Sequence, residues 1–310
     1  MKYYMKKIIN ILIYFFSLPI PQTSQFIIVG GWFGQRFADN SKALYLYLFR
    51  NKTKLGLKKV IYITKNKTLL KELKEENLEV LYAYSLVSIW YHMRAKIHIV
   101  DEGGTDLNRF FSIKAKRINL WHGFPLKKIG YYCDSNLKNI HDAITENSSK
   151  KQYQIGLWHC SYYLAFSSTL ARHLQYAFGC TDDKIINGPY PRQAYMNGTI
   201  NKIFLSNEKI AIGLLKEIRD DNKKVVFYLP TFRDEKSNNN ICLQTIFSLK
   251  PFLREKNLCL LTKLHFATDI ENPLSNDTDG NVINLPKECD VYNFLDLSDL
   301  LITDYSSVYF

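Results

Sequence analysis

The sequence predicts an α/β protein built from two consecutive αβα domains that face a cleft. Short apolar, β-branched or aromatic runs alternate with longer helix-like segments, which is the pattern of βα units on a parallel sheet. This alternation occurs twice, on either side of a polar segment at residues 197–207 that we take as the linker. The length of 310 residues also exceeds the ~250–300 at which one hydrophobic core stops growing.

The first series of elements is expected to form a domain over residues 23–196. Its strands are predicted at residues 25–30, 59–64, 79–84, 95–100, 117–121 and 162–167. Its helices are predicted at residues 40–50, 67–75 and 168–178. The last of these helices begins at a Ser-Ser-Thr stretch, whose hydroxyls suit an N-cap.

The second series is expected to form a domain over residues 208–310. Its predicted helices are residues 207–218, 243–252 and 291–297, and its predicted strands are residues 224–230, 258–265, 281–286 and 300–304.

Residues 1–22 are expected to associate with a membrane surface. Lys2, Lys6 and Lys7 precede an apolar run from Ile8 to Ile20. This run is shorter than the ~20 residues that a membrane-spanning helix needs. An interfacial helix would place the lysines near anionic headgroups and the apolar side chains in the acyl boundary. A first helix packed on the domain is the alternative.

Composition points to an anionic partner. The chain has 41 Lys+Arg against 29 Asp+Glu, a formal net charge of +12, which suits a phosphate polymer, nucleic acid or an acidic membrane. Nucleic acid is not expected, because the lysines are dispersed and no nucleic-acid motif is recognised. The six cysteines are scattered without a CxxC pair, as in a reduced cytoplasmic protein. No metal or other cofactor is expected, except Mg²⁺ as a companion of a phosphate substrate, and no GxSxG motif supports a serine hydrolase.

Polar residues gather where the predicted strands end. They are His122 and Gly123, Thr231 and Arg233, Lys263 and His265, and Asp304, Ser306 and Ser307. Each alone has an ordinary structural interpretation, such as a surface ion pair or a helix N-cap. Because ligands bind beyond the carboxyl ends of parallel strands, four polar strand ends in equivalent positions indicate a site.

The corner at residues 117–130 suits a general base. His122 titrates near neutrality and would take a proton from an attacking hydroxyl, while Gly123 lets a substrate approach the backbone. Pro125 is expected to be the first residue of a helix after the corner. Lys127 and Lys128, just beyond the corner, would then attract an anionic substrate.

The remaining strand ends suit a bound pyrophosphate. Lys263, Arg233 and a protonated His265 would offset its charge, and arginine can grip two oxygens at once. The hydroxyls and backbone N–H groups of Ser306 and Ser307 would form an anion cradle at a helix start. The residues themselves therefore predict phosphate transfer.

Six short motifs follow one another along the chain, and their order matters for the comparison below. They are "WFGQRFADNSKALYLYL", "LWHGFPLKKIG", "GPYPRQ", "YLPTFRD", "KLH" and "SDLLITDYSSVYF". Together they resemble the CDP-glycerol glycerophosphotransferase family, whose enzymes build teichoic acids and related capsule polymers. The resemblance extends from about residue 20 to the last residue.

The resemblance implies a GT-B architecture of two Rossmann-like domains, with the nucleotide bound mainly by the second. It also implies transfer of glycerol phosphate, or a related polyol phosphate, from CDP-glycerol to a hydroxyl of a lipid-linked or polymer acceptor, with release of CMP. The enzyme would be a peripheral protein on the cytoplasmic face of the cell membrane.

Matching motifs imply the following roles. His122 would be the general base, with Gly123, Lys127 and Lys128 on the acceptor side. The donor's phosphates would be held by Thr231, Arg233, Lys263, His265, Asp304, Ser306 and Ser307. Arg192 would contact phosphate at the domain boundary.

The chain departs from the family pattern at several positions. Phe124 and Phe266 stand where the family has Thr and Pro, and Gln193 and Ala194 stand where Asn-Asp is usual. These changes are expected to reshape a site and not to abolish it. The resemblance also implies a helix after Ser306 and Ser307, but the chain stops at Phe310, four residues after Ser306. A helix of that length cannot sustain itself, because nucleation orders several residues for one hydrogen bond. The second domain is therefore expected to be C-terminally truncated and incomplete, with a weakened donor-phosphate cradle. Two alternative functions remain: a GT-B nucleotide-sugar glycosyltransferase, which shares the fold and phosphate chemistry, and an inactive, truncated, membrane-bound subunit of a polymer assembly complex.

Overall fold

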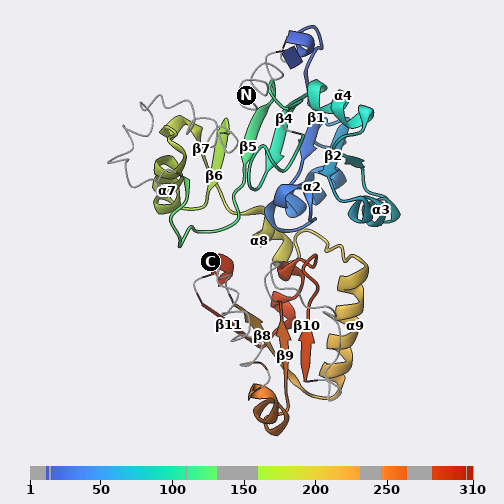
Figure 1. The fold of residues 1–310 in the computed structure, drawn as a ribbon, viewed down its shortest axis with the longest axis vertical. Helices are drawn as coiled ribbons and strands as arrows, with labels where there is room; N and C mark the ends of the chain where they lie inside the picture. The colour runs from blue at the N-terminus through green and yellow to red at the C-terminus, as the bar shows by residue number, and fades with distance from the viewer. Residues whose placement is uncertain are drawn as a thin grey trace, which may run out of the picture. The chain divides into compact units, whose positions relative to one another are not determined.

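The computed structural model divides the chain into two units. Unit 1 is Met1–Asn201 and unit 2 is Lys202–Phe310. The residues that the structure describes are 12–13, 15–108, 110–130, 160–230, 246, 248–263, 281–304 and 306–309. Each unit contains its own parallel sheet (Figure 1).

Unit 1 is built on a seven-stranded parallel sheet. Its strands are β1 (Thr23–Val29), β2 (Lys59–Thr64), β3 (Val80–Tyr82), β4 (Ala95–Val100), β5 (Lys116–Asn119), β6 (Tyr162–Ala165) and β7 (Ile185–Asn187). They lie in the order β3-β2-β1-β4-β5-β6-β7. The chain moves outward in one direction as far as β3 and then in the other from β4, so a topological switch point lies between β1 and β4. Open parallel sheets bind ligands at the carboxyl ends of strands at such a point.

The central strands of this sheet are buried on both faces. Ile28 and Val29 in β1, Val60 and Tyr62 in β2, and Val100 in β4 have no exposed surface. Near-continuous apolar runs are what strands covered by helices on both faces require. This explains why these runs were recognisable as strands without a polar–apolar alternation.

Helices connect the strands of unit 1. They are α2 (Asp39–Arg50), α3 (Lys67–Glu75), α4 (Leu86–Arg94), α7 (Ser168–Phe178) and α8 (Pro191–Met196). The short 3₁₀ turns are η1 (Trp32–Gly34) and η3 (Asp182–Lys184). The helices pack on the sheet and on one another, with α7 against β6 and β7, and α2 against β2 and α8.

Side-chain caps define several of these helix starts. The Ser167 hydroxyl accepts a hydrogen bond from the backbone N–H of Leu170 at 3.1 Å, which confirms the N-cap expected for α7. Gly179 ends the same helix in the left-handed conformation at φ 59°. Asn66 caps α3 by accepting from two backbone N–H groups of its first turn.

Unit 2 contains a four-stranded parallel sheet in the order β10-β9-β8-β11. Its strands are β8 (Lys224–Leu229), β9 (Leu258–Thr262), β10 (Val282–Asn284) and β11 (Leu300–Thr303). One helix is α9 (Ser206–Asp220), and residues 248–255 are also helical. Ala211 and Leu215 of α9 belong to a buried cluster with Phe227 of β8 and Leu261 of β9. Apolar burial between helix and sheet therefore holds this unit together.

Two expectations about helices were wrong. Residues 291–297 form two 3₁₀ turns, η4 (Val291–Asn293) and η5 (Leu295–Leu297), and not one α-helix. Phe294 separates them at φ −118°. Pro125 does not begin a helix either, because residues 124–129 are irregular. Leu126 is 40% exposed, so this stretch has no continuous apolar face to hold a helix against the unit.

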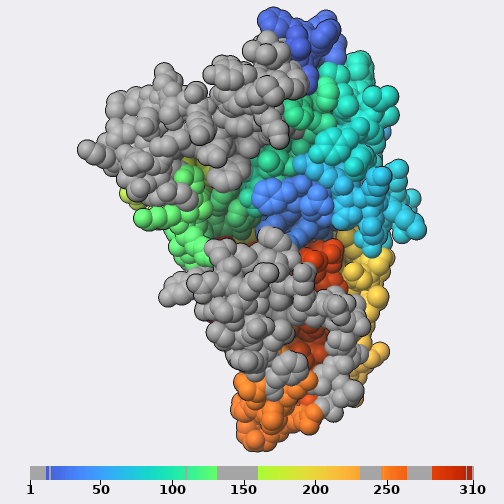
Figure 2. Space-filling view, viewed as in Figure 1, coloured from blue at the N-terminus to red at the C-terminus, as the bar shows by residue number. Residues whose placement is uncertain are grey.

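The N-terminal segment exposes apolar side chains. Leu12 is 50%, Phe15 is 62% and Phe16 is 76% exposed. Figure 2 shows this segment in dark blue at the top of the view. Among the described residues, no helix is both long and apolar enough to cross a bilayer.

Candidate functional site

The candidate site lies at the carboxyl edge of the unit 1 sheet, at its switch point. Gly31 follows β1, Asp101 and Glu102 follow β4, and His122 follows β5. These three strands are neighbours in the sheet. Three segments from distant parts of the sequence therefore meet where α/β folds bind ligands.

The His122 ring is partly exposed and bounded by aromatic rings. Its side chain is 28% exposed. The ring centroids of Trp121 and Trp32 lie 4.3 and 5.8 Å from its own. Its Nδ1 atom is buried and lies 3.2 Å from Oε1 of Glu102. The exposed part of the imidazole is therefore the part that points away from the Glu102 carboxylate.

A buried polar cluster supports the backbone beneath this histidine. The Arg192 guanidinium donates to the His122 carbonyl at 2.8 Å and pairs with the Asp39 carboxylate at 3.0 Å. The Asn40 side chain donates to the Trp121 carbonyl at 2.8 Å and accepts from the backbone N–H of Arg192 at 3.2 Å. Each connection is local in space and remote in sequence. The cluster ties the start of α2 and the start of α8 to the corner after β5.

Asp106 organises the turn after β4. Its Oδ2 accepts from the backbone N–H groups of Asp101 at 2.9 Å and Glu102 at 2.7 Å. Its Oδ1 accepts from the backbone N–H of Phe33 at 2.8 Å. These bonds hold the turn that carries Glu102 against the segment that follows β1.

The backbone around the site adopts unusual conformations. Trp32, Phe33, Asp39 and Trp121 have φ values of 48°, 57°, 64° and 56°, and Gly123 has a φ of 152°. A left-handed conformation costs a non-glycine residue on the order of 1–3 kcal/mol and persists only where the surroundings enforce it. The other non-glycine residues with positive φ in the described chain are Asn77, Asn222 and Asn257, a residue type that tolerates this region.

Gly31 allows the close approach of two strand ends and a helix. A Cβ atom at this position would lie 2.2 Å from the Ser41 hydroxyl and 2.3 Å from the Asp101 carboxylate. Asp101 uses its other carboxylate oxygen to accept from the backbone N–H of Ser41 at 3.0 Å, at the start of α2. Only glycine fits between these groups.

Burial shifts the pKa of His122 in the direction that suits a base. Burial and the charge of Arg192 lower this pKa. Asp39, Asp106 and the backbone of Asp101 oppose the shift. A lowered pKa keeps the imidazole neutral near pH 7, which is the form that accepts a proton. Burial raises the pKa of Glu102 to about 7, an effect that Arg36 opposes.

The predicted acceptor-side residues divide into two groups. Gly123 and Arg192 lie at the corner, and the Gly123 carbonyl accepts from the Tyr190 hydroxyl at 3.4 Å. Lys127 and Lys128 follow the corner and are exposed. Arg192 is 1% exposed and its guanidinium pairs with Asp39, while its contact with phosphate stays a prediction.

The described donor-side residues lie in unit 2. Lys263 follows β9 and its ammonium donates to the Cys289 carbonyl. Asp304 follows β11, and the Ser306 backbone N–H donates to its carbonyl at 2.8 Å. The Ser306 hydroxyl accepts from the backbone N–H of Val308 at 3.3 Å, at the turn η6 (Ser307–Tyr309). Because β9 and β11 are parallel to β8, these residues lie at the same edge of the sheet. Thr231, Arg233 and His265 lie outside the described residues.

Sequence reasoning did not single out Glu102, Asp106, Asp39 or Asn40. A signal was present for Glu102, which forms an acidic pair with Asp101 directly after a buried strand. Asp39 and Asn40 stand in a quoted motif, but only the fold reveals that they support the His122 corner.

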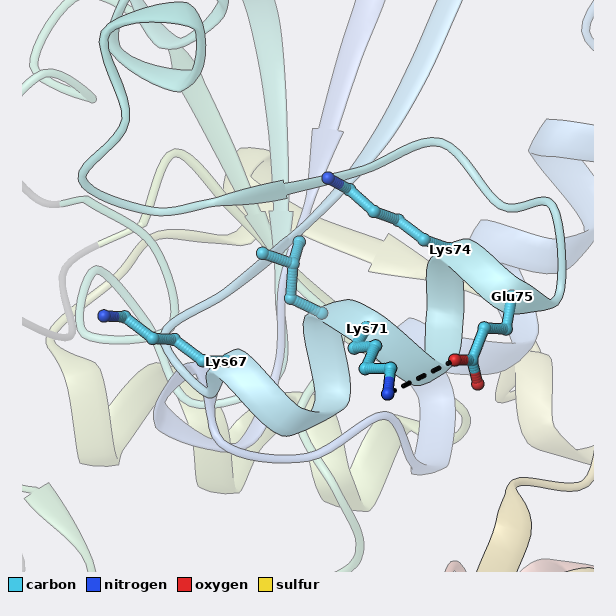
Figure 3. A pocket seen from close by; sticks show the side chains of 5 residues that line it. Lys67, Lys71, Lys74 and Glu75 are labelled. Carbon is cyan, nitrogen blue, oxygen red and sulfur yellow. Dashed lines mark ion pairs between the residues drawn. The ribbon is translucent and has the colours of Figure 1, made fainter.

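An open pocket lies on α3, and none of its lining residues belongs to this site. It is lined by Lys67, Leu70, Lys71, Lys74 and Glu75. Lys71 and Glu75 form an exposed ion pair at 3.9 Å, while Lys67 and Lys74 both extend toward the upper left of the view (Figure 3). This is a solvated lysine face and carries no buried polar group. In the described part of the chain, no three acidic, histidine or cysteine side chains are grouped to hold a metal ion.

Comparison with known proteins identifies similar chains. A family model described as CDP-Glycerol:Poly(glycerophosphate) glycerophosphotransferase matches residues 12–310. A teichoic acid poly(glycerol phosphate) polymerase of Bacillus spizizenii is 26% identical over 315 residues, covering 94% of this chain and 72% of that protein. A teichoic acid glycerol-phosphate transferase of Staphylococcus aureus is 26% identical over 289 residues, covering 89% and 68%.

Solved structures establish the fold. The wall teichoic acid polymerase TagF superposes with a TM-score of 0.62 at 20% identity, covering 99% of this chain and 73% of that one. The S. aureus MnaA–UDP co-structure gives a TM-score of 0.51 at 14% identity, covering 90% and 74%. The predicted fold class, α/β and GT-B-like with Rossmann-like units, is confirmed.

Proposed function

Because this chain belongs to the CDP-glycerol:poly(glycerophosphate) glycerophosphotransferase family, we propose that it transfers glycerol phosphate from CDP-glycerol to a hydroxyl of an acceptor in teichoic acid synthesis and releases CMP. The observation that carries this proposal is the placement of His122. It follows β5 at the carboxyl edge of a doubly wound sheet, next to the strand β4 that borders the switch point, with a partly exposed ring and a lowered pKa.

The chemical step assigns one proton to His122. The acceptor hydroxyl oxygen attacks the phosphorus that bears glycerol, and the bond from this phosphorus to the CMP oxygen breaks. The hydroxyl proton passes to the exposed nitrogen of the imidazole as the new phosphodiester forms. Charge that develops on the phosphoryl oxygens calls for cationic and N–H donors.

The donor's phosphates are proposed to bind at the carboxyl edge of the unit 2 sheet. Lys263 and Ser307 are the described residues offered for this role, with Asp304 and Ser306 shaping the turn beside them. The proposal also includes Thr231, Arg233 and His265, which lie outside the described residues. We assign Mg²⁺ no role other than binding together with the donor's pyrophosphate.

A membrane-associated acceptor and a peripheral position on the cytoplasmic face are also part of the proposal. The exposed Phe15 and Phe16 and the net charge of +12 support attachment to an anionic surface. The acceptor would be lipid-linked or a growing polymer. A related polyol donor such as CDP-ribitol is the nearest alternative substrate.

The test is release of CMP by purified protein supplied with CDP-glycerol and a lipid-linked acceptor. His122→Ala should lower the rate by about 10²- to 10⁴-fold, which is the contribution of a general base. Lys71→Ala, on the exposed face of α3, is the matched surface control and should keep the wild-type rate. A His122→Ala protein that folds normally and retains full activity would refute the role of this residue.

Donor screening separates the remaining functions. CMP release from CDP-glycerol with no turnover of nucleotide sugars supports the proposal. Turnover of a nucleotide sugar alone would favour a glycosyltransferase. No turnover of any donor, with normal folding, would favour a non-catalytic subunit.

A further inference from the structure

We infer that Glu102 is the positioning residue of the candidate base: its carboxylate accepts a hydrogen bond from Nδ1–H of His122 and so directs the lone pair of Nε2 toward the acceptor hydroxyl. This inference rests on the proposed function of His122. It adds a residue that belongs to none of the motifs by which the chain resembles its family.

The geometry of the pair carries the inference. Glu102 Oε1 lies 3.2 Å from His122 Nδ1, within reach of a hydrogen bond. Nδ1 is buried and makes no well-aligned hydrogen bond within the described residues, so the Glu102 contact is a close approach that has yet to align. A buried ring nitrogen without a partner is costly, so a carboxylate at this distance is its natural acceptor. Such bonds are often poorly aligned before substrate binds.

The backbone that carries the Glu102 side chain is fixed by hydrogen bonds. Its N–H donates to the Asp106 carboxylate at 2.7 Å, and the N–H of Asp101 donates to the same oxygen at 2.9 Å. The side chain is only 14% exposed. A carboxylate on a turn fixed in this way restricts the ring against it more than a mobile surface side chain could.

The charged groups around the pair decide its pH dependence. Arg36 acts on Glu102, while Asp39 of α2 and Arg192 of α8 act on His122 from the other side of the corner. Asp101 and Asp106 lie in the turn beneath, and burial raises the pKa of both. The backbone carbonyl of Asp101 also favours a protonated His122 ring and is the competing acceptor.

The sign of the expected pH profile follows from these shifts. Burial raises the pKa of Glu102 to about 7, so below pH 7 the carboxylate takes up a proton and no longer orients the ring as an anion. The wild-type rate should therefore fall as the pH drops through about 7. In Glu102→Gln no carboxylate titrates, and the acid limb should move to lower pH, where His122 itself becomes protonated.

The experiment measures kcat and KM for CDP-glycerol from pH 5.5 to 8.5, with about 10-fold or greater loss expected in kcat for Glu102→Ala, within the range a base contributes. Glu102→Gln should show a smaller loss, little change in KM and the displaced acid limb. Glu102→Asp should restore part of the wild-type profile. Glu217→Gln, on the exposed face of α9, is the matched control and should change nothing.

A second measurement does not depend on activity. Nitrogen NMR of the histidine rings, assigned with His122→Ala, should show the Nδ1–H tautomer of His122 in the wild type and its loss in Glu102→Ala. The Nε2–H tautomer in the wild type would overturn the inference. So would a tautomer and pH profile that remain unchanged in Glu102→Ala, since Asp101 would then orient the ring. Wild-type protein without transferase activity would refute the proposed function, while the tautomer would still decide the role of Glu102.

Discussion

The side chain of Arg192 connects segments of unit 1 that lie far apart in the sequence. Its guanidinium reaches the carboxylate of Asp39 and the carbonyl of His122, and it packs over the Tyr190 ring at 4.9 Å. It is 1% exposed. A buried ion pair gives little net stability compared with apolar residues, but removing one partner leaves the other charge uncompensated. At this scale the His122 corner therefore depends on a residue that does not itself contact the reacting groups.

The first prediction concerns this residue. Arg192→Ala should lower the free energy of unfolding by about 3–5 kcal/mol, because it removes the cation that pairs with the buried Asp39 carboxylate. Urea unfolding monitored by circular dichroism is the measurement. Arg172→Ala, on the exposed side of α7, is the control and should stay within about 0.5 kcal/mol of the wild type. Equal midpoints for the two variants would show that the pair contributes nothing to the corner.

At the scale of elements, the start of α2 decides how closely the strand ends can approach. Asp101, after β4, accepts from the backbone N–H of Ser41 in the first turn of α2. Asp39 accepts from the N–H of Asn40. The two carboxylates therefore accept hydrogen bonds from N–H groups that have no acceptor within the helix. Carboxylates at this position also interact favourably with the positive, N-terminal end of the helix dipole. Gly31 is the position where this arrangement leaves no room for a side chain.

A pair of glycine substitutions tests that packing. Gly31→Ala should destabilise unit 1, because its Cβ would meet Ser41 and Asp101 at less than 2.5 Å. Gly213→Ala, inside α9, has no heavy atom within 4 Å of the added Cβ and should be neutral or stabilising by about 0.5–1 kcal/mol. Thermal unfolding of both variants is the comparison to make. Similar shifts for both would contradict the close approach at Gly31.

Element boundaries were predicted well where a buried strand or an amphipathic helix was long. The predicted bounds of β2, β4, α3 and α7 match the structure. The missed elements include α4, which has nine residues, and two shorter ones. β7 has three residues, and α8 has six and begins at Pro191, within a Pro-rich stretch that suggests a loop. Tertiary contacts stabilise such short elements, and local sequence carries little information about them.

At the scale of the whole molecule, charge and exposed apolar side chains favour an anionic surface as partner. The net charge of +12 supplies a long-range attraction, and the segment with Phe15 and Phe16 supplies a short-range apolar contact. The first term weakens with ionic strength, whereas the second does not. The proposed peripheral attachment can therefore be separated into two measurable parts.

The corresponding prediction uses vesicles. Sedimentation with vesicles that contain anionic lipid should fall by about 10-fold or more on changing both Phe15 and Phe16 to Ser, since each buried phenyl ring contributes about 1.5–3 kcal/mol. Raising the salt concentration should weaken binding of the wild type as well. Phe252→Ser, 49% exposed in unit 2, is the control and should bind like the wild type. If the paired variant binds as well as this control, the N-terminal segment is not the attachment site.

The α/β class and the family could be predicted from the order of elements and motifs along the chain, because that order is written in the sequence. The residues that contact His122 could not be predicted in this way. Glu102 comes beside it because β4 and β5 pair in the sheet, and Asp39 comes beside Arg192, 153 residues away, because α2 packs on α8. Pairing of strands and packing of helices are non-local, and the periodicity of a single segment contains no record of which distant segment it will contact.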